Sequence, residues 1–152
     1  MNIVNVEIRQ INPNAVKPKR ATSGSAAYDL FLPKDTQSFH LLPKEVVSIG
    51  LGFSIDLLKD DLAFIMMPRS GTGSRGLHLA NVTGLVDSDY QGEITLKLTN
   101  DSNDSIFVDA TKAVAQAIIT PVLAAYWTEV EDHTRTTLRG EGGFGHTDSI
   151  SP

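Results

Sequence analysis

The segment of this sequence best equipped for chemistry is Gly84–Glu93, which reads Gly-Leu-Val-Asp-Ser-Asp-Tyr-Gln-Gly-Glu. It places Asp87, Asp89 and Tyr90 in a hairpin candidate bracketed by glycines. A carboxylate is ionised at neutral pH and can orient and deprotonate a water molecule, while a tyrosine ring offers a flat face to a sugar or a base. A hairpin whose aspartates only fix the turn explains the same residues equally well.

A second segment, Pro68-Arg69-Ser70-Gly71, has the residue types of a phosphate cradle. Arginine brings a planar fork of donors, serine brings a hydroxyl, and glycine lets the backbone approach a ligand closely. Taken alone, such a tetrapeptide is more often a turn that carries a surface arginine. Because no Gly-Lys-Ser/Thr follows a glycine-rich stretch, a phosphate loop of the Walker type is excluded.

The chain changes composition after Thr134 and becomes rich in Gly, Thr and Ser, with Arg139 and Phe144 set among glycines. An arginine beside exposed backbone amides suits a terminal phosphate, and an aromatic ring between glycines can stack on a base. A stretch with so little apolar surface is hard to fold into a core. We therefore predict a domain over residues 1–134 and a flexible Gly-rich arm over residues 135–152, a tail without function being the alternative.

Short strands must position these segments, because the periodic signal is of period two. Alternating apolar residues and β-branched runs, broken by turn clusters, predict many short strands at near-regular spacing and hence an all-β sandwich, barrel or jelly roll. At most one short helix is expected, around residues 72–80. The alternating sets are Val4, Val6 and Ile8, then Ile94, Leu96 and Leu98, then Ile106 and Val108, and the runs cover residues 46–49, 63–67 and 114–122.

The composition excludes several classes of protein. A length of 152 residues fits one domain, and the absence of cysteine excludes disulfides and thiolate metal sites. A net charge of -5 argues against a reader of nucleic acid, which needs a basic face. No apolar stretch reaches the ~18 residues of a membrane span, and no targeting pattern opens the chain. We expect a cytoplasmic protein with neither nucleic acid nor membrane as a partner, and a small anionic ligand is compatible with this charge.

Five segments, in the same order along the chain, resemble the motifs of the trimeric dUTPase family. Together they favour the functional interpretation of each segment over the structural turns and the functionless tail considered above. They cover residues 25–30, 68–71, 84–92, 115–119 and 139–147. The resemblance implies a jelly-roll-like, distorted β-barrel subunit in a homotrimer. Each active site would be assembled from all three chains, with the arm of one chain closing over a site shared by the other two.

The resemblance also implies an activity, that of a dUTP diphosphatase. Such a hydrolase of nucleotide metabolism converts dUTP to dUMP and pyrophosphate by in-line attack of water on the α-phosphorus. It limits uracil incorporation into DNA and supplies dUMP for thymidylate synthesis. The implied cofactor is Mg²⁺, bound through the substrate phosphates and waters with no direct protein ligand expected.

Position within the motifs implies a role for each candidate residue, with Asp87 as the catalytic group that activates the water. Uracil and deoxyribose would be read by Asn81, by the backbone at Gly84 and Val86, and by Tyr90 beneath the sugar. The phosphates would be held by Arg69, Ser70, Gly71 and Gln116. The arm would add Arg139 and Thr147 at the terminal phosphate, Phe144 stacked on uracil and Gly145 as a further substrate-binding residue. Asp29 would support the site.

Some positions depart from the commoner family pattern. Gln91 stands where many members have Arg, Asp148 stands where Gly is common, and the stretch from Gly71 to Gly84 is one residue shorter than usual. One rival reading is a dCTP deaminase, which shares the fold and the trimer but attacks the base, and the Asp87/Tyr90 segment and the arm argue against it. Another is a non-catalytic nucleotide sensor or protein-binding module on the same scaffold.

Overall fold

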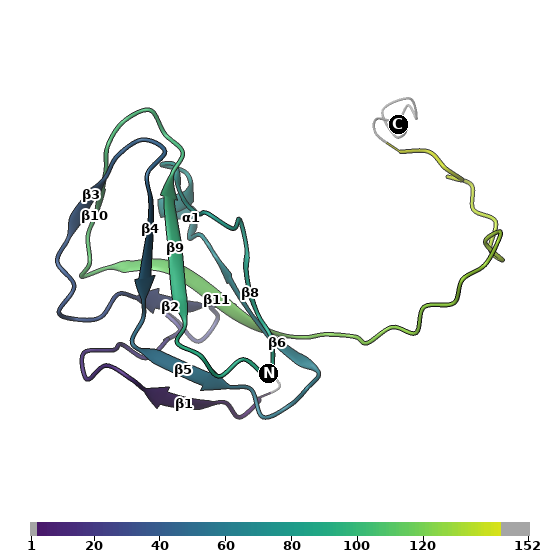
Figure 1. The fold of residues 1–152 in the computed structure, drawn as a ribbon, viewed down its shortest axis with the longest axis horizontal. Helices are drawn as coiled ribbons and strands as arrows, with labels where there is room; N and C mark the ends of the chain where they lie inside the picture. The colour runs from purple at the N-terminus through teal and green to yellow at the C-terminus, as the bar shows by residue number, and fades with distance from the viewer. Residues whose placement is uncertain (1–2, 144–152) are drawn as a thin grey trace.

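The computed structural model describes residues 3–143 and shows a β body from which the C-terminal segment extends (Figure 1). The described residues form one short helix, α1 (Ser70–Gly73), and eleven strands. The strands are β1 (Glu7–Gln10), β2 (Tyr28–Phe31), β3 (Phe39–Leu41), β4 (Val46–Gly50), β5 (Phe53–Asp56), β6 (Leu62–Met67), β7 (Leu77–Leu79), β8 (Gly84–Val86), β9 (Thr95–Asn100), β10 (Ile106–Val108) and β11 (Ala113–Pro121).

The strands pair antiparallel in four small sheets. The largest has the order β2-β11-β6-β8, the next β4-β9-β7, and two pairs are formed by β1 with β5 and by β3 with β10. The sheets do not close into one barrel among the described residues, so the body is a distorted jelly roll. The predicted all-β fold with one short helix is confirmed. The position of the helix differs, because α1 covers Ser70–Gly73 while residues 77–79 of the expected segment 72–80 form β7.

The core follows from the period-two pattern. In β9, Leu96 and Leu98 are buried while Thr95 and Lys97 are exposed, as expected for a strand with one face on the core. The central strand β11 is apolar on both faces, and its Ala115 and Ala117 are fully buried between β2 and β6. Each fully buried leucine contributes roughly 1.5–3 kcal/mol.

The hairpin expected around residues 84–93 is wrong. Strand β8 pairs with β6, whereas β9 pairs with β4 and β7, so the chain crosses from one sheet to another. The turn itself exists, since the backbone N–H of Tyr90 donates to the carbonyl of Asp87 at 3.2 Å. Residues 87–94, called here the 87–94 loop, therefore connect two different sheets and do not form the turn of a β-hairpin.

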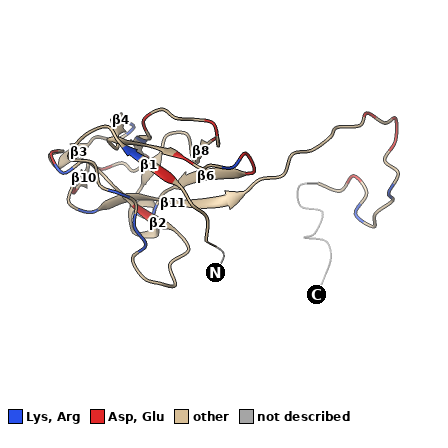
Figure 2. Cartoon of the chain, turned by 90° about the horizontal axis from the view of Figure 1, so that it is seen from below, with Lys and Arg blue, Asp and Glu red and all other residues tan. Residues whose placement is uncertain are grey.

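The chain leaves the body at the end of β11. The backbone N–H of Val122 donates to the carbonyl of Asp61 at 2.8 Å, and from there residues 123–143 run away from the sheets (Figures 1 and 2). Leu123, Tyr126 and Trp127 are almost completely exposed. The predicted division between residues 134 and 135 falls within this segment and stays a prediction. Figure 2 also shows acidic and basic residues interspersed over the body.

Candidate functional site

Three strands of the largest sheet bring three of the five motifs together. Asp29 on β2 lies opposite Gln116 on β11, and Gln116 lies opposite Met67 at the end of β6. Arg69 follows β6 by two residues. Antiparallel pairing thus places residues from distant parts of the sequence in one row, which the sequence pattern alone does not reveal.

Arg69 is held on two sides within this row. Its Nε donates to Asp29 Oδ1 at 2.9 Å, and its Nη1 donates to the carbonyl of Ala113 at 3.3 Å. The side chains of Arg69 and Asp29 are 37% and 16% exposed, so the pair is only partly shielded from water. Since a guanidinium has five N–H donors in a planar fork, these two bonds fix its plane and leave donors for a ligand.

The turn into α1 is fixed from the neighbouring strand. Gln116 Nε2 donates to the carbonyl of Pro68 at 3.0 Å, which holds the peptide that precedes Arg69. Arg69 is extended, with φ -81° and ψ 152°, and the helix begins at Ser70. The first backbone N–H groups of a helix have no acceptor inside it, so those of Ser70 and Gly71 remain available. A Cβ on Gly71 would meet nothing within 4 Å, which means that packing within this chain does not require glycine there.

These groups line a cavity of about 650 Å³, a size ordinary for a small-molecule site. The wall opposite Arg69 is the loop over residues 21–27, whose placement depends on a residue that the sequence analysis missed. Arg20 donates from its guanidinium to the carbonyls of Ser23 and Ser25. An arginine ahead of a Thr-Ser-Gly-Ser turn was the only sequence signal. The cavity is lined by Ala21, Ser25, Ala26, Ala27, Asp29, Met67, Arg69, Ser70, Gly71, Gln116 and Ile118.

Asp87 and Tyr90 lie together in a smaller pocket of about 180 Å³, with Val86 and Ile94 in its wall. The Tyr90 hydroxyl donates to the carbonyl of Glu93 at 3.2 Å, and the ring crosses Gly92 so closely that a Cβ there would lie 2.4 Å from the phenolic oxygen. The tyrosine is 47% exposed, so part of its ring stays open to a ligand.

Asn81 lies in the turn between β7 and β8, just before Gly84. The backbone N–H of Thr83 donates to the Asn81 carbonyl at 2.6 Å, and the residue between them, Val82, has φ 63°. This is a strained conformation for a β-branched residue, and such strain collects at ligand sites. The amide of Asn81 is exposed there.

Within one chain the two groups of residues lie apart. Strand β8 runs antiparallel to β6, with Gly84 opposite Met66 and Val86 opposite Phe64. Asp87 therefore continues toward the start of β6, whereas Arg69 lies past its end. Six residues of chain, four in β6 and two beyond it, separate these two levels, which places Asp87 and Arg69 roughly 20 Å apart. The structure does not bring Asp87 into the cavity of Arg69.

The arm residues stand outside both groups. Arg139 lies in a turn on the extended segment, where its Nε donates to the carbonyl of Gly142 at 2.8 Å. Phe144, Gly145 and Thr147 lie outside the described residues, as does Asp148.

Two kinds of feature are absent from residues 3–143. No three His, Cys, Asp or Glu side chains in this range could together hold a metal ion. No helix in the same range is long and apolar enough to cross a membrane.

One acid in the turn before β11 has a clearly shifted pKa. The hydroxyl of Thr111 donates to Asp109 Oδ1 at 2.6 Å, and the backbone N–H of Thr111 donates to the same oxygen at 3.0 Å. Together with Lys112 at 3.2 Å, these bonds lower the pKa of Asp109. The turn leads directly into Ala113, the residue whose carbonyl accepts from Arg69.

The comparisons with known proteins agree with the five motifs. The family model for dUTPase matches residues 14–148. The chain is 40% identical over 147 residues to the deoxyuridine 5′-triphosphate nucleotidohydrolase of Francisella philomiragia subsp. philomiragia, covering 95% of this chain and 99% of the relative. It is 39% identical over 145 residues to the protein of the same name from Francisella tularensis subsp. novicida, covering 93% and 97%.

Solved structures agree on the fold. A dUTPase of Staphylococcus bacteriophage 80alpha in complex with dUpNHpp has a TM-score of 0.81 at 22% identity, covering 94% of this chain and 98% of that one. A dUTPase from phage phi11 of S. aureus, described with a structural Mg(II) ion, has a TM-score of 0.74 at 19% identity, covering 86% and 99%.

Proposed function

This chain belongs to the dUTPase family, and from that premise we propose that it hydrolyses dUTP to dUMP and pyrophosphate. The observation that carries the proposal is the row of Asp29, Gln116 and Arg69, because it turns three separate motifs into the wall of one cavity. The names of the Francisella relatives support dUTP as the substrate.

In the proposed mechanism Asp87 accepts a proton from the water that attacks the α-phosphorus. Pyrophosphate leaves on the opposite side of the phosphorus, so the water must be held in line with the bond that breaks. Reactions of this kind depend on positioning and on stabilisation of phosphate charge rather than on covalent chemistry with the protein. One exposed carboxylate on the 87–94 loop is therefore a sufficient base.

The phosphate chain is proposed to lie in the cavity of about 650 Å³. Arg69, pinned by Asp29 and by the Ala113 carbonyl, would present its remaining donors to the phosphates, beside the N–H groups of Ser70 and Gly71. The Gln116 amide holds the Pro68 carbonyl with one N–H and would offer its second N–H to the phosphates. The arm would complete the phosphate site with Arg139 and Thr147 at the terminal phosphate.

The nucleoside is proposed to lie at the pocket of Asp87 and Tyr90, with the sugar on the tyrosine ring. Uracil presents an acceptor, a donor and an acceptor along its pairing edge, which the Asn81 amide and the backbone at Gly84 and Val86 can match. Cytosine would leave buried groups unpaired, a mismatch that can discriminate by about 10^4 to 10^5. Phe144 from the arm would then cover the base.

Mg²⁺ is the proposed cofactor, and the donor set fits an ion carried mainly by the substrate. One oxygen of Asp29 is engaged with Arg69, so the other oxygen can accept from a metal-bound water without becoming a ligand itself. When bound, the ion would supply charge neutralisation along the phosphate chain. The structural Mg(II) of the phage phi11 protein lends support to a role for this metal in the family.

We further propose that each site is completed between copies in a homotrimer. The separation of Asp87 from Arg69 within one chain supports this, because one dUTP cannot contact both unless a second copy supplies one of them. The exposed Leu123, Tyr126 and Trp127 also support it, since apolar side chains of this size are normally buried. The arm of a third copy would close over the site.

The biological role that follows is to keep uracil out of DNA and to supply dUMP for thymidylate synthesis. The expected cytoplasmic location stays a prediction, as does the absence of nucleic-acid and membrane partners. The alternative function, a dCTP deaminase, is separated from this proposal by one assay that measures both products.

The test is pyrophosphate release with Mg²⁺ from dUTP, dCTP, dTTP and UTP, with ammonia release measured in parallel. We expect dUTP to be turned over in clear preference to the other three. Ammonia from dCTP, or equal rates on all four nucleotides, would overturn the proposal.

A further inference from the structure

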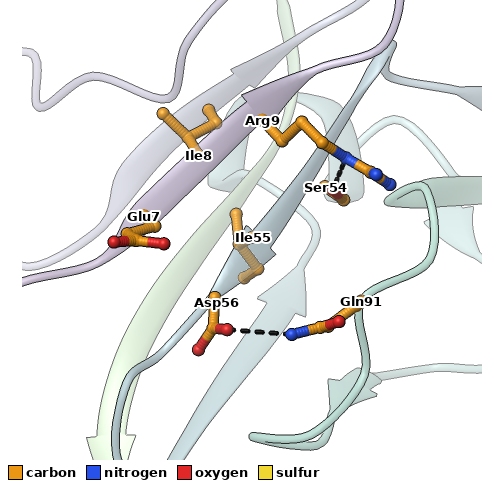
Figure 3. A pocket seen from close by; sticks show the side chains of 7 residues that line it. All are labelled: Glu7, Ile8, Arg9, Ser54, Ile55, Asp56 and Gln91. Atoms are coloured by element: carbon orange, nitrogen blue, oxygen red, sulfur yellow. Dashed lines mark hydrogen bonds between the residues drawn. The ribbon is translucent and has the colours of Figure 1, made fainter.

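Two side chains of the 87–94 loop, besides the backbone of Ile94, tie it to the strand β5 and the turn before it. Gln91 Nε2 donates to Asp56 Oδ2 at 2.9 Å at the edge of a pocket of about 360 Å³, as Figure 3 shows. Two residues further on, Glu93 Oε1 accepts from the backbone N–H of Gly52 at 2.8 Å. Residues 87–93 belong to no strand. The backbone of Ile94 accepts from the N–H of Leu51 at 2.8 Å and donates to the carbonyl of Phe53 at 2.9 Å, so the loop is fixed at that end. The side-chain contacts of Gln91 and Glu93 extend this attachment toward Asp87.

The turn before β5 is shaped to receive the Glu93 carboxylate. A Cβ on Gly50 would lie 2.3 Å from Glu93 Oε1, so any larger residue there would displace the side chain. Gly52 has φ 77°, and a Cβ on it would lie 2.8 Å from the Cβ of Asn12. A backbone N–H that faces a half-buried carboxylate in this way makes a charge-assisted bond, stronger than one between neutral groups.

The other anchor is itself held in place. Asp56 Oδ1 accepts from the backbone N–H of Leu58 at 2.8 Å, which leaves Oδ2 directed to Gln91. Figure 3 shows Asp56 and Gln91 pointing toward one another from separate segments. Gln91 is exposed whereas Glu93 is half-buried, so Glu93 is the stronger of the two anchors.

Both anchors connect to Asp87 through Tyr90. The Tyr90 hydroxyl donates to the carbonyl of Glu93, and its backbone N–H donates to the carbonyl of Asp87 at 3.2 Å. A shift of Glu93 therefore moves the ring of Tyr90 and the peptide of Asp87 together. Misplacement of a reacting group by about 1 Å can cost 10²-fold in rate.

We propose that Glu93, assisted by Gln91, is a positioning residue that sets the location of the Asp87 carboxylate through hydrogen bonds to Gly52 and Asp56. This rests on the proposed function, because the position matters to catalysis only if Asp87 activates the water. The role of Glu93 is to accept a hydrogen bond, and a neutral acceptor of the same shape should fulfil it.

The experiment compares Glu93→Ala with Glu93→Gln in the full-length protein. We expect Glu93→Ala to lower kcat for dUTP about 10- to 100-fold with KM changed much less, and to speed amide hydrogen exchange at Gly52. Glu93→Gln keeps an acceptor oxygen and should restore both kcat and slow exchange. Gln91→Ala should lower kcat by a smaller factor. Combining Asp56→Ala with Gln91→Ala should lower kcat no further, because the two residues share one hydrogen bond.

Asp101→Asn provides the matched control, because it changes an exposed carboxylate that pairs with Lys44 at 3.5 Å and follows β9 at the end of the strand opposite the loop. It should leave kcat and Gly52 exchange unchanged. The proposed positioning role of Glu93 would be overturned if Glu93→Ala kept the wild-type kcat or the wild-type exchange rate at Gly52. It would also be overturned if Glu93→Gln folded but lost as much kcat as Glu93→Ala. If the wild-type chain released no pyrophosphate from dUTP, the proposed function would fail, while the exchange at Gly52 would still decide whether Glu93 anchors the loop.

Discussion

Asp87 follows the last residue of β8 and is exposed beside the ring of Tyr90. Its position explains how one carboxylate can serve as a base: it is tied to the protein through its backbone while its side chain remains open to water. Asp89, in the same turn, is also exposed but does not line the pocket of Tyr90. The two acids of one turn are therefore not equivalent.

Asp87→Asn should bind dUTP and lose most of its turnover. The amide keeps the size of the side chain but cannot take the proton, and general-base catalysis contributes typically 10^2 to 10^4 in rate. Calorimetric titration with a non-hydrolysable dUTP analogue and single-turnover kinetics measure the two effects separately. Asp89→Asn is the matched control and should turn over at close to the wild-type rate. Equal losses in both variants would assign the loss to the turn rather than to Asp87.

At the scale of elements, the strands were predictable and their partners were not. Alternating apolar residues predicted β9 and β10, because each of these strands has one face on the core. The alternation of Val4, Val6 and Ile8 reached β1 only at Ile8, which is half-buried. The same pattern cannot tell whether β8 turns back on β9 or crosses to another sheet, since pairing depends on packing between distant segments. For that reason the sequence suggested a hairpin at residues 84–93, and the structure has the 87–94 loop.

The phosphate-side residues show the same division. The residue types of the segment at Arg69 suggested a cradle, and the family resemblance added Asp29 and Gln116. Their meeting depends on the register of β2, β11 and β6, which a single sequence does not reveal. Arg20 and Glu93 were missed because each acts on a backbone group that has no sequence signature.

The turn before β11 should give the body a measurable acid sensitivity. Its Asp109 carboxylate has a lowered pKa because Thr111 donates two hydrogen bonds to it and Lys112 lies close. A group with a lowered folded-state pKa contributes stability that is present above the unfolded pKa and is lost as the pH falls through the folded value. Asp109→Asn should therefore be less stable than wild type at neutral pH, and the gap should shrink in acid.

Urea unfolding of wild type and Asp109→Asn, followed by fluorescence at near-neutral pH and at a pH below the aspartate range, measures this gap. Asp101→Asn serves as the control carboxylate. A gap of constant size across the pH range would show that the bonds from Thr111 do not stabilise the charged form of Asp109.

At the scale of the whole molecule, the chain has two separate parts of one proposed active site, the cavity of Arg69 and the pocket of Asp87, and an apolar segment that extends away from the body. The segment after β11 contains Leu123, Tyr126 and Trp127, and composition placed these residues within the domain. Apolar side chains indicate burial, but they do not indicate whether the burying surface belongs to the same chain or to another copy. The exposure of these residues and the separation of Asp87 from Arg69 lead to the same inference, that copies share their sites.

Mixed assemblies provide the direct test of shared sites. Asp87→Asn and Arg69→Ala should each be nearly inactive, because the first lacks the base and the second lacks the phosphate donor. If Asp87 and Arg69 of one site come from different chains, a site can combine the intact Asp87 of one variant with the intact Arg69 of the other. Random mixing in equal amounts should then restore about a quarter of the sites in a cyclic homotrimer.

The recovery is informative because it cannot arise from either variant alone. Both proteins are unfolded together, refolded and assayed for pyrophosphate release from dUTP, while each variant carried through the same steps separately gives the background. Native mass spectrometry establishes that the chains have mixed, since the two variants differ in mass. If mixed assemblies form and the activity stays at background, Asp87 and Arg69 act within one chain, and the roughly 20 Å between them would have to close by a rearrangement of β8 against β6. Such a rearrangement would break the pairing of Gly84 with Met66 and of Val86 with Phe64, which makes a site shared between chains the less costly arrangement.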